Sequence, residues 1–118
     1  YEYDLDKYFI DNYAYFIKSD NDILGFVLID DNRNNNYEIS EIFVLNNYKR
    51  NKIGKEVAIK VFDMYKGNWT IKAVPNSKVA ESFWKMVVKD YTNNNYIEKY
   101  TGKYNRLEIY FSNGDLDD

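Results

Sequence analysis

The chain has 118 residues, with 16 Lys and Arg against 19 Asp and Glu, a net charge of −3, and neither His nor Cys. Without Cys there is no disulfide framework or thiolate nucleophile, and without His there is no Ser-His-Asp triad, imidazole base or ordinary catalytic zinc site, so we expect no metal. The acidic balance argues against a nucleic-acid partner, and no apolar run approaches the roughly 20 residues of a membrane span. The length suits one domain, which we expect over residues 1–114 with an acidic tail at 115–118. We expect the cytoplasm as the default location.

The first half of the sequence predicts a short helix followed by three strands. The helix is expected over Asp4–Ile10, where the first residue can act as N-cap. The segments Tyr13–Lys18 and Ile23–Asp30 are rich in aromatic and branched residues, and the polar cluster at 19–22 between them indicates a hairpin turn. Tyr37–Leu45 predicts a third strand, after a run of Asn residues that favours a loop.

The second half alternates helices with strands. An apolar stripe at helical spacing predicts the first helix, which Gly67 would end, and a second amphipathic helix should turn Val79 and Phe83 toward the core. The resulting order predicts an α+β fold with helices packed against a mixed sheet. The elements expected here are a helix over Lys52–Lys66, a strand over Trp69–Val74, a helix over Ser77–Lys89, and a closing hairpin of Tyr96–Tyr100 and Arg106–Ser112.

One segment carries charge of the opposite sign to the rest of the chain. The short loop after the third predicted strand contains Lys49, Arg50 and Lys52, and Lys55 lies in the first turn of the helix that follows. The first N–H groups of a helix have no partner within the helix, and the helix dipole favours anions there. Gly54 would let a ligand approach the backbone closely. The loop therefore predicts a phosphate or pyrophosphate site, and the alternative is a solvated basic turn.

Two motifs resemble the GNAT family of N-acetyltransferases. The family signature for acyl-CoA is a strand ending in an apolar-Val pair and a loop of the form [RQ]-x-x-G-x-[GA] that enters a helix. Here Phe43-Val44 ends the strand and the loop runs from Lys49 to Gly54, with Lys49 in place of Arg or Gln and Lys52 in place of the first Gly. The segment 76–85 resembles the family's N-x-x-A-x-x-[FL]-[YW] helix. The resemblance covers nearly the whole chain, is nearest to a small bacterial subgroup of predicted acetyltransferases, and implies the GNAT (acyl-CoA N-acyltransferase) fold.

The resemblance implies a site for acetyl-CoA as acyl donor. Loop amides would hold the pyrophosphate, and the pantetheine arm would pair with the strand end like an added strand, where Tyr37–Leu45 and Trp69–Val74 splay apart. Asn76 would contact the arm or hold its loop, although a helix cap after Pro75 is an equal alternative. Trp84 would pack against the cofactor or the core. The expected cofactor-binding residues are Phe43, Val44, Lys49, Arg50, Asn51, Lys52, Ile53, Gly54, Lys55, Asn76 and Trp84.

The implied reaction is direct transfer of the acetyl group to the amine of a small molecule or peptide, which needs neither His nor Cys. The candidate bases are Glu41 and, after it, Glu38; because side chains alternate along a strand, only one of them should face the acceptor. The family's general-acid Tyr is replaced by Trp84, whose indole N–H is too weak an acid. Tyr91, near the end of the same helix, is the candidate substitute.

Other interpretations stay open. The chain starts late relative to the family, so we expect its N-terminal strand to be missing or short. The departures at Lys52 and Trp84 favour a second function, a catalytically weak GNAT-fold module that binds CoA or acyl-CoA for regulation or assembly. A third interpretation is a partner-binding domain without a CoA site. The Tyr-rich surface would allow a homodimer.

Overall fold

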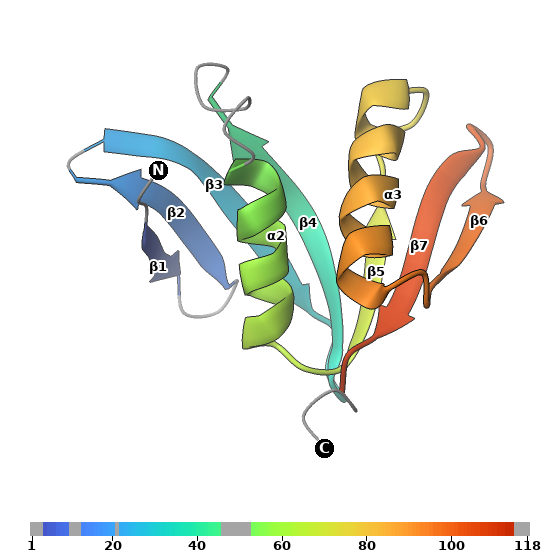
Figure 1. The fold of residues 1–118 in the computed structure, drawn as a ribbon, viewed down its shortest axis with the longest axis horizontal. Coiled ribbons are helices and arrows are strands. Elements are labelled where there is room, and N and C mark those ends of the chain that lie inside the picture. Colours follow the sequence, from blue (N-terminus) through green and yellow to red (C-terminus); the bar gives the residue numbers. More distant parts are fainter. Residues whose placement is uncertain (1–3, 10–12, 21, 46–52, 115–118) are drawn as a thin grey trace.

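The elements follow the predicted order, with one exception at the N-terminus. The computed structural model describes residues 4–9, 13–20, 22–45 and 53–114. Figure 1 shows a twisted sheet with both helices on the same face. The elements are β1 (Asp4–Phe9), β2 (Ala14–Ser19), β3 (Asp22–Asp31), β4 (Asn36–Val44), α2 (Ile53–Met64), β5 (Asn68–Lys72), α3 (Lys78–Thr92), β6 (Ile97–Thr101) and β7 (Arg106–Ser112).

The seven described strands form one mixed sheet in the order β1-β2-β3-β4-β5-β7-β6. Only β4 and β5 are parallel among them, and α2 provides the crossover that parallel neighbours need. The strands β1 to β4 form an antiparallel meander. The turn predicted at 19–22 is confirmed, because Ser19 pairs with Asp22, and the closing hairpin is confirmed by the pairing of Thr101 with Arg106.

The helix expected over Asp4–Ile10 is wrong, because this segment forms strand β1. It pairs antiparallel with β2, beginning with Asp4 opposite Lys18. A single helix of this length is unstable in isolation, whereas the edge of β2 offers a row of backbone groups in need of partners. Leu5 packs against the core while Asp4 is exposed, which follows the two-residue period of a strand. The N-terminal strand of the sheet is therefore present, with six residues.

Both helices bury one face against the sheet. The helix α3 begins after Ser77, whose side chain accepts a hydrogen bond from the Ala80 N–H at 3.1 Å, and it ends at Asn93 in the left-handed conformation. This is the pattern of an N-cap and a C-cap that satisfy orphan backbone groups. The stripe predicted for the first helix is confirmed in α2, whose buried residues are Ile53, Val57, Ala58, Val61 and Phe62.

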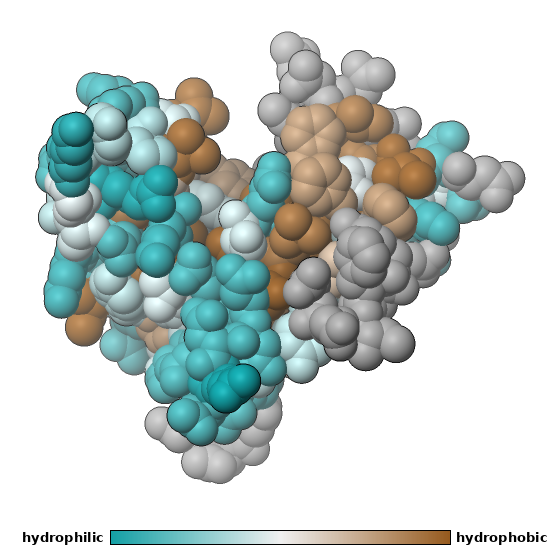
Figure 2. Space-filling view, turned by 180° about the vertical axis from the view of Figure 1, so that it is seen from behind, coloured by the Kyte–Doolittle hydropathy of each residue, from teal (hydrophilic) through white to brown (hydrophobic). Residues whose placement is uncertain are grey.

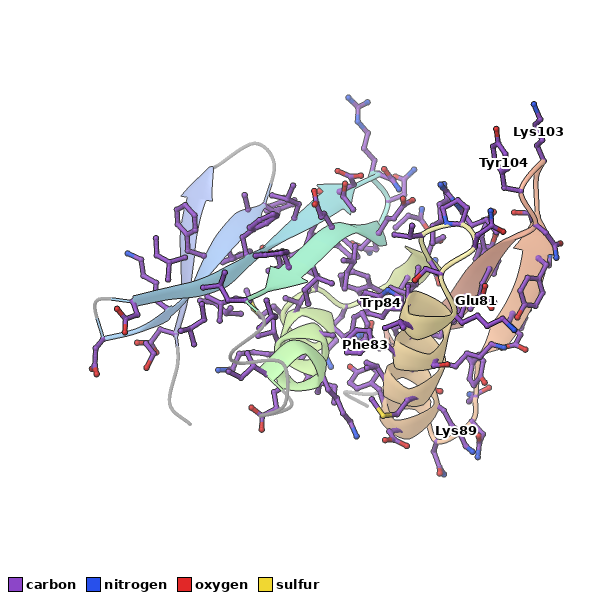
Figure 3. All side chains as sticks on the ribbon, turned by 90° about the horizontal axis from the view of Figure 1, so that it is seen from above. Glu81, Phe83, Trp84, Lys89, Lys103 and Tyr104 are labelled. Atoms are coloured by element: carbon purple, nitrogen blue, oxygen red, sulfur yellow. The ribbon has the colours of Figure 1, made fainter. Side chains whose placement is uncertain are left out.

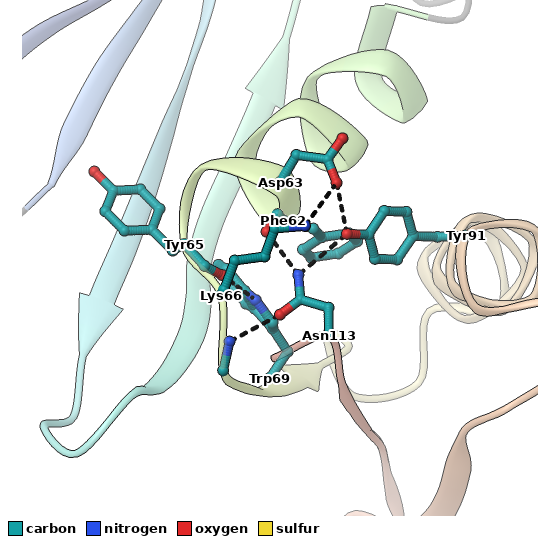
Figure 4. A network of polar contacts seen from close by, with 8 residues as sticks. Phe62, Asp63, Tyr65, Lys66, Trp69, Tyr91 and Asn113 are labelled. Atoms are coloured by element: carbon teal, nitrogen blue, oxygen red, sulfur yellow. Dashed lines mark hydrogen bonds and ion pairs between the residues drawn. The ribbon is translucent and has the colours of Figure 1, made fainter. Parts of the chain in front are cut away.

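An aromatic cluster fills the core where α2 ends. The ring centroid of Phe62 lies 5.0 Å from that of Trp69 and 4.9 Å from that of Phe111, both edge-on. Asn113 is fully buried beside them; it accepts a hydrogen bond from the Gly67 N–H at 2.8 Å and donates one to the Phe62 carbonyl at 2.7 Å, as Figure 4 shows. Because the last carbonyls of a helix have no partner within it, Asn113 ties the end of α2 to the end of β7.

The two faces of the sheet differ in their covering. The helices α2 and α3 lie on one face, and no helix in the described part of the chain covers the other, which we call the open face. Figure 2 views this face and shows hydrophobic side chains gathered on the half formed by β2 to β4, while the half toward β6 is largely hydrophilic. Its residues alternate with core residues along each strand; those used below are Phe16, Phe26, Leu28, Asp30, Glu38, Glu41, Phe43, Lys72, Glu108 and Tyr110.

Candidate active site

A cleft of about 680 Å³ opens where β4 and β5 separate. The two strands pair only from Asn36 opposite Asn68 to Ile39 opposite Ile71. Beyond that point β4 continues along β3, and β5 continues along β7, so the expected splay of these strands is present. Within the described residues, segment 40–44 has a strand partner on one side only. The backbone N–H and C=O groups on the side of this segment that lacks a strand partner can therefore form hydrogen bonds with a ligand.

The cleft passes through the sheet from one face to the other. Val44 and Trp84 line it from the side of the helices, and Glu41 and Lys72 line it from the open face. A ligand that enters between the helices can thus meet a second ligand that approaches from the open face. This arrangement suits a reaction between two substrates that bind on opposite sides of a sheet.

A β-bulge in β4 decides which side chains reach the cleft. Leu28 of β3 lies opposite Glu41, and the next residue, Ile29, lies opposite Ile39. Ser40 is therefore an extra residue with no counterpart on β3, and such a residue shifts the alternation of side chains by one position. As a result, the buried side chain of Ile39 and the partly buried side chain of Ile42 both face the helices.

The bulge places both candidate carboxylates on the open face. Regular alternation would send Glu38 and Glu41 to opposite faces, so that part of the prediction is wrong. The two side chains differ instead in their surroundings. Glu41 is exposed and lines the cleft, whereas the Glu38 Oε1 lies 3.6 Å from the Lys72 Nζ and Glu38 does not line the cleft. Glu41 is therefore the carboxylate that can reach a ligand there.

The amino ends of both helices lie at the cleft. The helix α2 follows β4 and α3 follows β5, so both helices start at the edge of the sheet where these parallel strands end (Figure 1). Gly54 in the first turn of α2 and the α3 N-cap Ser77 line the cleft. Two positive dipole ends favour an anion at this place, together with the first N–H groups of the two helices, apart from that of Ala80, which the Ser77 side chain already accepts. Crevices at the carboxyl ends of parallel strands are common ligand sites for this reason.

Gly54 also serves helix packing. A Cβ atom at this position would lie 3.3 Å from the Phe83 Cζ and 4.0 Å from the Val44 Cγ2. The first of these distances is tighter than ordinary van der Waals contact, so the missing side chain lets α3 approach α2. Ile53, just before it, is fully buried. The sequence predicts close approach of a ligand to Gly54, and the structure adds the approach of Phe83.

The predicted phosphate loop is described only at its last residues. Lys55 lines the cleft, but its Nζ lies 2.6 Å from the Asp90 Oδ2. This contact holds the pKa of the Asp90 carboxyl below its usual range, and it offsets part of the positive charge of Lys55. The residues of the prediction that lie outside the described residues are Lys49, Arg50, Asn51 and Lys52.

The other cofactor candidates divide between the two faces. Val44 and Trp84 are nearly buried and line the cleft from the side of the helices. Figure 3 shows Phe83 and Trp84 pointing from α3 toward α2 and β4, and their rings meet edge-on at 4.9 Å. Phe43 lies on the open face, so only its backbone could pair with a ligand in the cleft. Trp84 is thus a wall of the cleft and a member of the core at once.

Asn76 lies beside the cleft but does not cap α3. Its φ is +63°, in the left-handed region, and its side chain is exposed. The cap is the next residue, Ser77, whose side chain accepts a hydrogen bond from the Ala80 N–H. The alternative role of Asn76 as helix cap is therefore wrong. Its neighbours Val74 and Ser77 line the cleft, so its role toward a ligand stays a prediction.

Tyr91 lies at the far end of α3 from the cleft. Its hydroxyl donates to the Asp63 Oδ1 at 2.7 Å and accepts from the Asn113 Nδ2 at 3.1 Å (Figure 4). Its ring centroid lies 5.1 Å from that of Phe62. At the helical rise of 1.5 Å per residue, Tyr91 is about 12 Å along the helix from Phe83. It does not reach the cleft, and no tyrosine among the described residues lines it.

An apolar stripe of α3 lines the cleft, and of its residues Phe83 also packs against the core, as predicted. Val79 is 83% exposed, so the prediction that it faces the core is wrong. Together with Phe83 and the half-exposed Met86 it lines the side of the cleft. The spacing of these three residues is that of a core stripe, so the sequence held no signal to separate the two uses. Lys72 was also missed, since a lone Lys at the end of a strand is commonplace.

A second group of polar side chains lies on the open face of β7. Glu108 accepts hydrogen bonds from the hydroxyls of Thr101 and Tyr110. These bonds lower the pKa of the Glu108 carboxyl, and the bond from Tyr110 raises the pKa of that phenol to about 12. Among the described residues, no three His, Cys, Asp or Glu side chains gather closely enough to hold a metal ion.

The match of the chain to a family model extends over most of its length. The model of the acetyltransferase (GNAT) family matches residues 1–86. No curated protein matches the chain. In the part of the chain that the structure describes, no helix has the length and apolar character needed to cross a membrane.

Several solved structures share the arrangement of strands and helices. A Bacillus subtilis acetyltransferase in complex with CoA is 10% identical with a TM-score of 0.65, over 86% of this chain and 77% of that one. An IAA acetyltransferase from Bacillus cereus is 14% identical with a TM-score of 0.62, over 86% and 78%. A candidate streptothricin acetyltransferase from Bacillus anthracis, in complex with acetyl coenzyme A, is 20% identical with a TM-score of 0.55, over 85% and 60%. At these identities the likeness shows a common fold.

Proposed function

Because the chain belongs to the GNAT family of acetyltransferases, we propose that it moves an acetyl group from acetyl-CoA directly to the nitrogen of an amine. The observation that carries this proposal is the cleft through the sheet, with two helix amino ends beside one mouth and the exposed carboxylate of Glu41 at the other. Bound acetyl-CoA supplies an activated thioester. The protein has then to bind and orient two substrates and to accept one proton.

The residues of the cleft fit the acyl donor. Its volume of about 680 Å³ lies within the range of about 300–1,000 Å³ of small-molecule sites. The one-sided backbone of segment 40–44 can pair with the amides of a pantetheine arm as with an added strand. Val44, Phe83 and Trp84 provide apolar walls for the methylene groups of that arm. The amino ends of α2 and α3 offer N–H groups to its phosphates.

Glu41 is the proposed general base. An amine attacks a thioester as its free base, so an ammonium acceptor has to lose a proton on the way. The carboxylate of Glu41 lies at the open-face mouth, where it can take this proton directly or through a water. A backbone N–H of the bulged segment next to Ser40 would polarise the thioester carbonyl from the side that lacks a strand partner. Glu38, held by Lys72, would keep the charge of that lysine balanced.

One observation favours a second candidate function, a module that binds CoA or acyl-CoA without efficient turnover. The position of the family's general-acid tyrosine holds Trp84, and no tyrosine among the described residues lines the cleft. A thiolate can leave without an acid, but at a lower rate. A module of this kind would keep the donor site and lose only the chemical step.

Titration calorimetry with acetyl-CoA and a thiol-release assay over a panel of amines separate these functions. We expect saturable binding and amine-dependent release of free CoA. Glu41→Gln should lower kcat by about 10²-fold or more, as for other general bases, with an unchanged Kd for acetyl-CoA. Glu38→Gln is the matched control on the same strand and face and should have a smaller effect. Binding without release would favour the module, and absence of binding would contradict both functions.

A further inference from the structure

Three phenylalanines form a continuous row on the open face. Phe16 of β2 lies directly opposite Phe26 of β3, and Phe26 lies opposite Phe43 of β4. The rings of Phe26 and Phe43 stack, with centroids 5.7 Å apart and planes 26° from parallel. Phe43 is 44% exposed, and the other two rings are partly buried. The row therefore presents flat aromatic surface to solvent at the place where Figure 2 shows hydrophobic side chains gathered.

The aromatic row ends at the open-face mouth of the cleft. Phe43 follows Glu41 by two positions on the same face of β4, beyond the bulge at Ser40. Side chains two positions apart on a strand lie about 7 Å apart. Glu41 lines the cleft, while Phe26 and Phe43 lie just outside it. A molecule on the rings thus has its other end beside the carboxylate of Glu41.

The charges around this mouth favour a cationic group. Asp30 on β3 lies opposite Glu38, and both lie on the open face with Glu41. Lys72 is the cation of the cleft lining on this face, and its Nζ faces the Glu38 Oε1 at 3.6 Å. Glu41 has no ion pair of its own among those found in the described residues. An ammonium group beside Glu41 would therefore meet a carboxylate whose charge is not already balanced.

From this juxtaposition we infer that the acceptor is an aryl-alkylamine, a primary amine joined by two or three carbons to a flat aromatic ring. The inference rests on the proposed acetyl transfer and names the substrate class for the same site. The ring lies against Phe26 and Phe43, where stacking adds to burial of apolar area. The linker spans the step of about 7 Å along β4. The amine then sits beside Glu41 at the mouth, where its ammonium form gives one proton to the carboxylate. The neutral amine attacks the thioester carbonyl, the C–N bond of the amide forms and the C–S bond breaks. CoA leaves as a thiolate, which takes up the second proton that the attacking nitrogen loses.

A matched set of amines tests the inference in the thiol-release assay. The arylalkyl members are 2-phenylethylamine and 3-phenylpropylamine, and the comparison amines are butylamine, ethanolamine, spermidine and a free amino acid. We expect kcat/KM for the best arylalkylamine to exceed that for butylamine at least tenfold. Better turnover of spermidine, ethanolamine or the amino acid would overturn the inference while the proposed acetyl transfer stands. Release with none of the amines would overturn both.

Variants of the aromatic row test whether the preference comes from it. Phe26→Ala should lower the ratio of kcat/KM between 2-phenylethylamine and butylamine at least fivefold, and Phe26→Leu should lower it less. Tyr104→Ala is the control, because Tyr104 is 59% exposed at the tip of the β6–β7 hairpin, away from the cleft (Figure 3). An unchanged ratio in a folded Phe26→Leu protein would overturn the inference. So would a change of oligomeric state in Phe26→Ala on size-exclusion chromatography, because the row would then be covered by a second copy.

Discussion

Replacing Asn113 by alanine should destabilise the protein strongly, although the residue is far from the cleft. Asn113 is fully buried, and its side chain satisfies the N–H of Gly67 and the carbonyl of Phe62. Alanine would leave both groups without a partner, and a buried polar group in that state costs about 1–3 kcal/mol. The loss is therefore about 2–6 kcal/mol, toward the lower end if water fills the vacated space. Native domains are stable by only about 5–15 kcal/mol.

Urea unfolding measures this loss. Tryptophan fluorescence is a suitable signal, since Trp69 packs directly against Phe62 in the same region. Asn95→Ala is the matched control, because Asn95 is exposed in the loop after α3, and its effect should stay within about 0.5 kcal/mol. The m-value should not change in either variant. A loss below about 1 kcal/mol for Asn113→Ala would refute the argument that this amide holds the end of α2 to β7.

Tyr91→Phe removes one hydroxyl from the same network and should cost about 0.5–1.5 kcal/mol in thermal unfolding, with an unchanged affinity for acetyl-CoA by calorimetry; a weakened affinity would contradict the position assigned to Tyr91. Ser77→Ala removes the N-cap of α3 and should cost about 1 kcal/mol, whereas Ser82→Ala on the exposed side of that helix should not, and equal effects would argue against the cap. Glu108→Gln should flatten the loss of stability in acid. The native pKa of Glu108 is lowered from its ordinary value of 4.5, so its contribution is full above that value and disappears as the pH falls through the native pKa. Melting temperatures from pH 6 to pH 2.5 test this, and a slope equal to that of the unchanged protein would count against it.

Much of the sheet was predictable because its signals are local. The hairpin of β2 and β3 follows from two branched, aromatic runs on either side of the polar turn at 19–22, and the stripe of α2 follows from apolar spacing alone. β1 was not predictable in the same way. Its six residues fit a helix cap and a helical face equally well, and only the free edge of β2 decides between the two structures.

The site was predictable to the extent that it rests on chain order. The splay of β4 and β5 and the position of Gly54 and Val44 at the cleft follow from the resemblance of the motifs. The bulge at Ser40 did not, because a bulge is a property of the pairing between two strands and has no signature within one of them. The prediction of Tyr91 as the general acid is wrong for a similar reason. The proximity of Tyr91 to Trp84 in the sequence does not indicate which end of the helix meets the ligand.

The parallel pairing of β4 with β5 extends over only four residues of each strand, and this short join has a consequence for how the protein folds. The meander of β1 to β4 pairs segments that are neighbours along the chain, whereas Asn36 and Asn68, whose side chains bond across the join at 3.2 Å, are 32 positions apart. Pairings of long sequence separation lose loop entropy before they gain contact energy, so they form late. The cleft exists only after this join has closed. We therefore expect acetyl-CoA binding to be regained only after the strand signal of the β1 to β4 meander has returned.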